Sequence, residues 1–310
     1  MFFLKYSMIL VALWLNSAKG TSMEAFFPNA NQNLTKITWA HAVNNQSLLE
    51  ETLKNDAINM IEADIQVGII NDTKTPIMAH DPNVTSNLTL HSFLQQIKDS
   101  NANAVSNSTR KGAKLDFKTI EAFEISIEIV KQFDKGGYPI WINADIIKGP
   151  INATAIPVDP TRFLAGANQF SDSILSIGWT TLYGANWTGS YTSEQIQLMI
   201  NTIHTSNITQ EITFPVRGGL AAQSKDLLMN LTGQISGSTL TIWSSEGDNV
   251  NVDDLRQLIK AIGLNRTYVD VPEDLLAKLH LEDLSSGCGT SQMTLPIFVV
   301  CLVLCLGNFF

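Results

Sequence analysis

The chain has 310 residues, of which 45% are hydrophobic and 16% are charged, and its formal net charge is -9. This globular composition excludes a collagen, a low-complexity disordered chain and a coiled coil. The acidic chain has no cluster of Lys and Arg, so we expect no nucleic-acid partner, because such a partner needs a basic surface. The length allows one large domain or two small ones.

Residues 1–20 have the features of a secretory signal peptide. Lys5 precedes an apolar stretch at residues 8–15, and Ala18-Lys19-Gly20 offers small residues on either side of a cleavage site. The alternative interpretation is a buried N-terminal helix. We expect the segment to direct the protein into the secretory pathway.

Short β-branched runs alternate with helical patterns in the body of the chain. The runs predict eight strands, at residues 37–43, 60–67, 113–119, 139–147, 173–180, 211–217, 239–245 and 266–271. Eight strands that alternate with helices over about 240 residues predict one α/β domain, a (β/α)8 barrel at residues 35–280. A doubly wound open sheet is the main alternative, although no Gly-rich phosphate loop follows the first strand.

Polar residues interrupt the apolar pattern at the ends of the first four predicted strands and in the segment 76–82. They are His41, Glu62, Asp64, His80, Asp116, Lys118, Asn143 and Asp145. Most form pairs at spacing i, i+2, which places both side chains on one face of a strand. A buried polar side chain in a barrel strand costs several kcal/mol unless it is paired or coordinates a metal.

If these pairs face the mouth of the barrel, carboxylates converge there with two imidazoles and one ammonium. A carboxylate cage without Cys suits Mg²⁺, Ca²⁺ or Mn²⁺ rather than zinc. Such a cation would neutralise a phosphodiester and activate its nucleophile. His41 and His80 would then act as base and acid, and Lys118 would stabilise charge on the phosphoryl oxygens.

Each of these residues also has a structural interpretation. A histidine at a strand end often has only a hydrogen-bonding role, and Asp116 and Lys118 are able to form an internal salt bridge. Asn143 and Asp145 would cap the following loop. Arg217 and Trp243, at the ends of the sixth and seventh predicted strands, are either substrate contacts or packing residues. The residue pattern leaves these alternatives open.

N-x-Ser/Thr sequons occur along the whole body and predict a glycosylated exterior. They begin at Asn33, Asn45, Asn71, Asn83, Asn87, Asn107, Asn152, Asn186, Asn207, Asn230 and Asn265. Random placement of the Asn, Ser and Thr of this chain would give about four sequons. The excess supports secretion.

The C-terminal residues 287–310 predict a membrane-attachment signal. Residues 295–310 are apolar and uncharged, and the small residues Ser285, Ser286 and Gly287 precede them across a polar spacer. This is the layout of a glycosylphosphatidylinositol (GPI) signal with attachment at Ser286, whose tail is removed. A short true membrane anchor is the alternative. Both place the domain outside the cell.

The three cysteines, Cys288, Cys301 and Cys305, all lie in this C-terminal segment. The body of the chain therefore contains no disulfide framework, no thiolate zinc site and no cysteine nucleophile.

Several runs of the sequence resemble the menorin family. They are the runs 37–44, 61–65, 76–82, 114–118 and 141–146, which include His41-Ala42-Val43-Asn44, His80-Asp81-Pro82 and Asn143-Ala144-Asp145. The similarity spans about residues 35–279. It implies the barrel fold of the phospholipase-C-like phosphodiesterase superfamily and a known family role in extracellular signalling to growing neurites.

The motifs are also similar to those of glycerophosphodiester phosphodiesterases and type-D sphingomyelinases. This similarity implies that His41 and His80 are the acid–base pair, that Glu62, Asp64 and Asp116 are metal ligands, and that Lys118 contacts phosphate. The chain departs from the His-Arg-Gly pattern of the glycerophosphodiesterases, because Ala42 follows His41.

Two functions are therefore expected as alternatives. One is a cell-surface, metal-dependent phosphodiesterase that acts on a lipid-like or glycerol-linked phosphodiester. The other is a catalytically silent recognition module that binds a cell-surface receptor. The residue pattern does not predict an oligomeric state.

Overall fold

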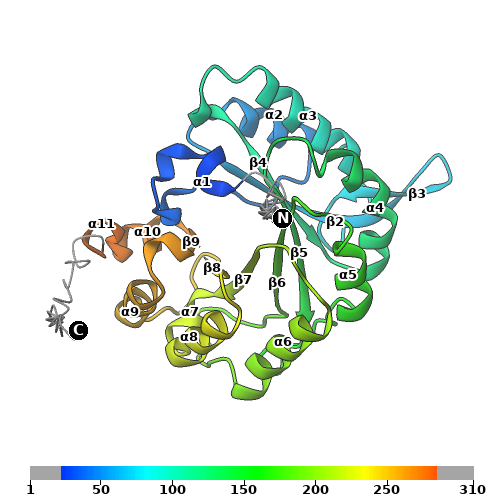
Figure 1. Ribbon diagram of the computed structural model, residues 1–310. Coiled ribbons are helices and arrows are strands. Elements are labelled where there is room, and N and C mark those ends of the chain that lie inside the picture. Colours follow the sequence, from blue (N-terminus) through cyan, green and yellow to red (C-terminus); the bar gives the residue numbers. More distant parts are fainter. Residues whose placement is uncertain (1–21, 285–310) are drawn as a thin grey trace, which may run out of the picture.

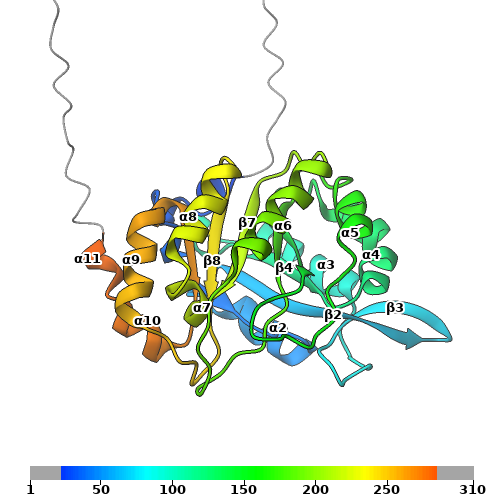
Figure 2. The ribbon, with the colours of Figure 1, turned by 90° about the horizontal axis from the view of Figure 1, so that it is seen from below.

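The computed structural model describes residues 22–284, and these form a ring of parallel strands surrounded by helices (Figures 1 and 2). The strands are β1 (Trp39–Ala40), β2 (Met60–Ile70), β3 (Thr73–Met78), β4 (Gly112–Phe117), β5 (Ile140–Ile147), β6 (Ile174–Trp179), β7 (Ile212–Arg217), β8 (Thr239–Trp243) and β9 (Thr267–Asp270). The α-helices are α1 (Met23–Phe26), α2 (Gln46–Lys54), α3 (Leu90–Ala102), α4 (Ile120–Phe133), α5 (Pro160–Ala167), α6 (Ser193–Thr205), α7 (Gly218–Ala222), α8 (Lys225–Gln234), α9 (Val252–Ile262), α10 (Glu273–Leu279) and α11 (Leu281–Leu284). Short 3-10 helices are η1 (Pro28–Ala30), η2 (Leu34–Lys36), η3 (Asn107–Thr109) and η4 (Leu264–Arg266).

Both predicted targeting segments lie outside the described residues. These are the signal peptide at 1–20 and the C-terminal signal at 287–310, together with its attachment residue Ser286. Within residues 22–284, none of the helices combines the length and the apolar character that crossing a membrane requires.

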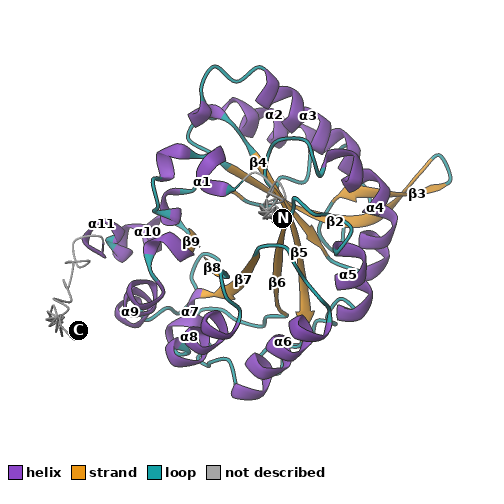
Figure 3. Ribbon diagram, viewed as in Figure 1, coloured by secondary structure: helices purple, strands orange, loops and turns teal. Residues whose placement is uncertain are grey.

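The order of the strands in the sheet follows their order in the sequence. Parallel pairs run in the order β1-β2-β4-β5-β6-β7-β8-β9, and each strand is followed by helices that cover the outside of the ring (Figure 3). A doubly wound sheet would reverse its strand order near the centre. The predicted (β/α)8 barrel is therefore confirmed, and the open-sheet alternative is wrong.

Side chains join the first and last strands of the barrel. Within the described residues, no backbone ladder pairs β1 with β9. Instead, the rings of Trp39 and Tyr268 meet edge to face with 6.3 Å between their centroids. Next to them, Nδ1 of His41 lies 2.9 Å from Oδ2 of Asp270. These contacts between β1 and β9 thus bring the two ends of the domain sequence together.

Among the described strands, β3 is the one that the sequence pattern does not predict. It pairs antiparallel with β2, and the two form a hairpin that projects from the barrel (Figure 1). Pro76 lies within β3, where an edge strand tolerates a proline that has no N–H to donate. The hairpin returns the chain to the rim, because the backbone N of Ala79 donates to the carbonyl of Asp64 at 2.9 Å.

The strands carry an apolar face and a polar face, and the polar faces of neighbouring strands are in register. Ile61, Ala63 and Ile65 of β2 are fully buried. Between them, Asp64 lies opposite Asp116 of β4, and Asp116 lies opposite Asn143 of β5. Since parallel partners in register share a face of the sheet, these side chains form one polar row at the carboxyl ends of the strands.

Candidate functional site

Three carboxylates from two neighbouring strands meet at the carboxyl end of the barrel. Glu62 and Asp64 lie on β2 and Asp116 lies on β4, and one oxygen of each lies within 4.8 Å of the other two. Glu62 and Asp64 are only 3% and 4% exposed. Such closely spaced carboxylates repel one another unless a cation lies between them. The three predicted metal ligands therefore form one group.

An uncharged donor holds one oxygen of each carboxylate in place. The backbone N of Ala42 donates to Oε2 of Glu62 at 2.8 Å, Nδ2 of Asn44 to Oδ2 of Asp64 at 2.7 Å, and Nδ2 of Asn143 to Oδ1 of Asp116 at 2.6 Å. These donors fix the side-chain orientations without neutralising the carboxylates. The second oxygen of each carboxylate accepts none of these hydrogen bonds and is available to a cation.

Lys118 supplies one cation to this group. Its Nζ lies 2.6 Å from Oδ1 of Asp64 and 2.5 Å from Oδ2 of Asp116. Burial by itself would lower the pKa of Lys118, but Asp116 and Asp64 outweigh burial and raise it above its usual range. The lysine is therefore a permanent cation rather than a proton donor.

The carboxylates differ in how strongly the protein favours their ionised forms. Burial raises the pKa of Glu62, and the nearby charges of His41 and Lys114 oppose this effect. Burial also opposes ionisation of Asp116, but the charges of Lys118 and Lys114 outweigh it and lower its pKa. Lys114 is 5% exposed and lies opposite Glu62 in the strand register. Its charge thus reaches the carboxylate group from within the barrel.

His41 lies at the rim, directly after β1, and its side chain is 50% exposed. Burial lowers the pKa of His41, but the contact with Asp270 and the charge of Glu62 outweigh burial and raise the pKa to about 8. Since Nδ1 contacts Asp270, the other ring nitrogen is left for chemistry. Ala42 then turns the chain with a left-handed φ of 51°, so that its N–H reaches Glu62.

His80 reaches the same rim but does not join the carboxylate group in its present conformation. It is exposed, and its Nδ1 lies 2.9 Å from the carbonyl oxygen of the next residue, Asp81. Within the described residues, its side chain forms no hydrogen bond or ion pair with Glu62, Asp64 or Asp116 and does not belong to their group of possible ligands. The hydrogen bond between Ala79 and Asp64 places the backbone that precedes His80 beside the site, but it does not place the His80 ring there.

The two polar residues predicted on β5 have different environments. Asn143 uses both ends of its amide, because it donates to Asp116 and its Oδ1 accepts from Ser176 Oγ at 2.6 Å. Asp145 has no hydrogen bond or ion pair of its carboxylate within the described residues. Burial and the charge of Asp116 raise the pKa of Asp145 to about 7. Within the described residues, Asp145 is therefore the one of the two whose side chain has no hydrogen-bond partner.

Arg217 and Trp243 form a second group on the opposite side of the ring. Nε and Nη2 of Arg217 donate to the two carboxylate oxygens of Asp248 at 2.7 and 2.8 Å. The guanidinium lies 4.4 Å from the ring centroid of Trp243. Trp243 in turn lies opposite Asp270 in the register of β8 and β9, which links this group to the partner of His41.

Four residues of the site are missed by the sequence pattern, namely Asn44, Lys114, Asp248 and Asp270. Asp270 is a polar residue at a strand end, like the residues that the pattern predicts, and Lys114 lies within β4 two residues before Asp116. Asn44 and Asp248 lie in loops, where polar residues are ordinary. Only the tertiary contacts identify them.

The donor set fits a hard divalent cation. Three carboxylate oxygens with no sulfur or imidazole among them suit Mg²⁺, Ca²⁺ or Mn²⁺. Lys118 contacts two of these oxygens, so it would have to yield part of this position to a bound cation. We therefore assign Glu62, Asp64 and Asp116 as the residues that would hold such an ion.

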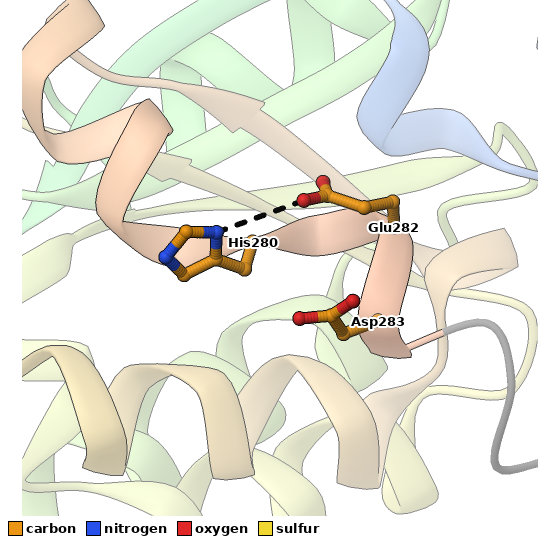
Figure 4. Close-up of side chains that lie close together, drawn as sticks. All are labelled: His280, Glu282 and Asp283. Atoms are coloured by element: carbon orange, nitrogen blue, oxygen red, sulfur yellow. Dashed lines mark ion pairs between the residues drawn. The ribbon is translucent and has the colours of Figure 1, made fainter.

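Other candidate features lie away from these carboxylates. His280, Glu282 and Asp283 form a second group of possible ligands at α11, but all three are exposed (Figure 4). A cavity of about 490 Å³ opens near the amino ends of β6 and β7 and is lined by residues such as Glu211 and Ser173. In barrels of this kind the chemistry occurs at the opposite, carboxyl end. The first group is exposed and the cavity lies at the amino end, so neither combines burial with a position at the carboxyl end as the three carboxylates do.

The sequon asparagines lie on the surface. Ten of the eleven are exposed, and Asn33 is partly buried. Several lie in loops that follow strands at the carboxyl end, including Asn45, Asn83 and Asn152. The fold is therefore compatible with attachment of a glycan at nearly all of these positions.

Comparison with known proteins places the chain among described relatives. A family model described as the menorin N-terminal domain matches residues 33–276. The Homo sapiens protein FAM151B is 34% identical over 266 residues, which cover 81% of this chain and 89% of that protein. The match spans the whole barrel.

Solved structures show weaker similarity. A glycerophosphoryl diester phosphodiesterase from Parabacteroides distasonis aligns with a TM-score of 0.45 at 12% identity, over 84% of this chain and 90% of that one. An L-ribulose 3-epimerase aligns with a TM-score of 0.40 at 13% identity, over 78% of this chain and 85% of that one. At these values neither structure assigns an activity to the chain.

Proposed function

The chain belongs to the menorin family, and we propose that it is an extracellular, membrane-anchored, metal-dependent phosphodiesterase. The proposed substrate is a lipid-like or glycerol-linked phosphodiester. The observation that carries the proposal is the group of Glu62, Asp64 and Asp116 with Lys118 at the carboxyl end of the barrel. Lys118 forms ion pairs with only two of the three acids, and within the described residues Glu62 has no ion-pair partner, so a salt bridge alone does not account for the group.

Lys118 and the two histidines each have a proposed role beside these carboxylates. When bound, a divalent cation would neutralise the phosphodiester and polarise its P–O bonds. Lys118 remains charged next to the carboxylates and would stabilise charge on the phosphoryl oxygens. His41, held by Asp270, would exchange a proton through its free ring nitrogen. His80 would supply the second proton transfer after its loop moves the ring toward the mouth.

The substrate contacts are proposed from the same rim. Asn143 and Asp145 lie beside Asp116, and Arg217 and Trp243 offer a cationic and an aromatic surface across the ring. The position that holds Arg in glycerophosphodiesterases is Ala42 here, and its N–H is occupied by Glu62. The phosphate would therefore depend on Lys118 and the metal, since Asp248 already holds Arg217.

We further propose that the domain lies at the cell surface. The signal-peptide pattern at residues 1–20, the exposed sequons and the GPI-like pattern around Ser286 support this location. A short membrane anchor in place of the GPI anchor would lead to the same location.

The second candidate function is a catalytically silent recognition module in contacts between cells. The observation that favours it is that several polar side chains of the site already have partners within the protein. Lys118 contacts two acids, Asn143 bonds Ser176, and Arg217 is paired with Asp248. Such a network stabilises the rim without turnover. Its ligand would be a cell-surface receptor.

One experiment separates the two functions. The secreted domain, residues 21–286, is purified and its content of Mg, Ca and Mn is measured, and it is then tested for turnover of lysophospholipids and glycerophosphodiesters. The enzyme hypothesis predicts bound divalent metal and turnover that His41→Ala or His80→Ala abolishes. A metal-free protein that turns over none of these substrates, and whose binding to cells survives His41→Ala, supports the recognition module.

A further inference from the structure

Asn44 lies at the junction of three segments that carry the proposed catalytic and metal-binding residues. It belongs to the loop that follows β1 and carries His41, and it lies against Asp64 of β2. It also contacts the segment between β3 and α3, which carries His80, through the Oγ of Ser86. Asp64 in turn accepts from the backbone N of Ala79 in that same segment at 2.9 Å, so Asn44 and Asp64 together link the three segments.

All polar groups of Asn44 are engaged. Its Nδ2 donates to Oδ2 of Asp64 at 2.7 Å, and its Oδ1 accepts from the backbone N of Asp64 at 2.9 Å. Its carbonyl oxygen accepts from Ser86 Oγ at 2.9 Å, and its backbone N donates to the carbonyl of Ala42 at 2.8 Å. The amide therefore contacts both the side chain and the backbone of one residue, which fixes the orientation of that carboxylate.

This double contact leaves Asp64 with one oxygen for a cation. Oδ2 is held by the amide of Asn44, and Oδ1 faces Lys118 and the other carboxylates. A carboxylate in the place of Asn44 would repel Asp64, and an ammonium would compete with a metal ion for it. A neutral amide orients the ligand without either effect.

We propose that Asn44 is a positioning residue for the divalent-metal site and holds both histidine-bearing loops against Asp64. This inference rests on the proposed metal-dependent function. Removing a residue that orients a metal ligand typically lowers metal affinity about 10–100-fold. We expect a loss of this size when the side chain of Asn44 is replaced.

The amino end of the barrel offers a matched control. Asn101 of α3 makes a similar pair of hydrogen bonds, but with two backbone groups of Lys111: its Nδ2 donates to the carbonyl at 2.8 Å and its Oδ1 accepts from the backbone N at 2.7 Å. Asn101→Leu therefore removes two comparable hydrogen bonds far from the carboxylates. Any general effect of losing such a pair appears in this variant.

The test is calorimetric titration of the secreted domain with MgCl2, CaCl2 and MnCl2, together with the rise in thermal midpoint that each salt causes. Wild type, Asn44→Leu and Asn101→Leu are compared with the cation that stabilises wild type most. We expect Asn44→Leu to raise the Kd about 10–100-fold and to reduce the thermal shift. Asn101→Leu should lower the midpoint without metal but keep the wild-type Kd.

The outcomes distinguish this inference from the proposed function. If wild type binds none of the three cations, the metal site and the role of Asn44 are both overturned. If wild type binds a cation and Asn44→Leu binds it equally well, only the role of Asn44 is overturned. If Asn44→Leu does not fold, Asn44→Ser replaces it, since the serine side chain is too short to make both contacts with Asp64.

Discussion

Two lysines at opposite ends of β4 show how the two ends of the barrel differ. Lys111 precedes the strand, is completely buried, and donates to the carbonyls of Asn55 and Ile58 at 2.7 and 2.6 Å. Burial lowers its pKa. Lys118 follows the strand, is 27% exposed on its side chain and contacts two carboxylates, which raise its pKa despite burial.

The difference lies in the acceptors. Neutral carbonyls give Lys111 a fixed structural position at the amino end, where (β/α)8 barrels place residues that serve stability. Carboxylates and partial exposure give Lys118 a charged site that a ligand is able to enter. We therefore expect changes at the amino end to alter stability alone, and changes at the carboxyl end to alter metal binding and turnover.

The largest expected effect is that of His41→Ala on turnover at the carboxyl end. Loss of a general acid or base lowers the rate about 10²–10⁴-fold. The midpoint of thermal unfolding should change little, because half of the His41 side chain is exposed. Turnover of the phosphodiester substrate and thermal unfolding are measured on the same preparations.

His204→Ala is the control for this prediction. His204 is exposed on α6 and borders the cavity at the amino end. It should retain wild-type turnover. Equal rates in His41→Ala and wild type would contradict the proposed role of His41.

A smaller effect, on stability alone, is expected for Lys111→Met at the amino end. Methionine fills a similar volume but leaves the carbonyl of Ile58 without its donor, whereas the carbonyl of Asn55 keeps the N–H of Ile58. An orphaned buried acceptor lowers the free energy of unfolding by about 1–3 kcal/mol. Urea unfolding measures this change, and Kd for the divalent cation should stay the same.

Lys131→Met provides the comparison for this variant. Lys131 forms a surface pair with Glu128, and such pairs contribute about 0–1 kcal/mol. Lys111→Met could instead be no more destabilising than Lys131→Met, or it could weaken metal binding. Either result would contradict the expected difference between the amino and carboxyl ends of the barrel.

The smallest expected effect is on the pH dependence of stability. The pKa of folded His41 is about 8, above the ordinary value of 6.5. The protonated form thus favours folding, and this contribution is fully present below pH 6.5 and is lost as the pH rises through 8. Because the side chain is 50% exposed, solvent screening keeps the contribution below about 1 kcal/mol.

Urea unfolding of the wild type and of Asp270→Asn at pH values from 6 to 9 tests this. Asp270→Asn removes the partner of His41 and should flatten the curve above pH 8, where Asp145, whose pKa is about 7, is already ionised. Lys111→Met should keep the wild-type slope. A slope that persists in Asp270→Asn would show that another group produces it.

The sequence pattern predicts the barrel and the carboxylate group well, because both depend on short-range spacing. The sequence pattern predicts a strand at residues 139–147, and β5 covers Ile140–Ile147. Alternation along a strand places Glu62 and Asp64 on one face whatever the partner strand is. The first strand is shorter than the predicted 37–43, since β1 pairs only at Trp39 and Ala40.

The sequence pattern fails where the contact is long-range. β3 contains Pro76 and charged and polar residues, and pairing with the protruding end of β2 overrides that local preference. Asp270 becomes the partner of His41 only when the last strand reaches the first. The sequence pattern places His80 with the carboxylates, whereas in the structure its Nδ1 lies against the carbonyl of Asp81.

By itself, the amino-acid sequence determined the alternation of strands and helices and the faces on which the acidic residues lie, because both follow from backbone periodicity over a few residues. Only the tertiary structure decided which uncharged donors orient those acids, and that the ammonium of Lys118 lies between Asp64 and Asp116. Closing the barrel joins segments that are distant in sequence, as with Asn44 and Asp64, and no local pattern encodes such a contact.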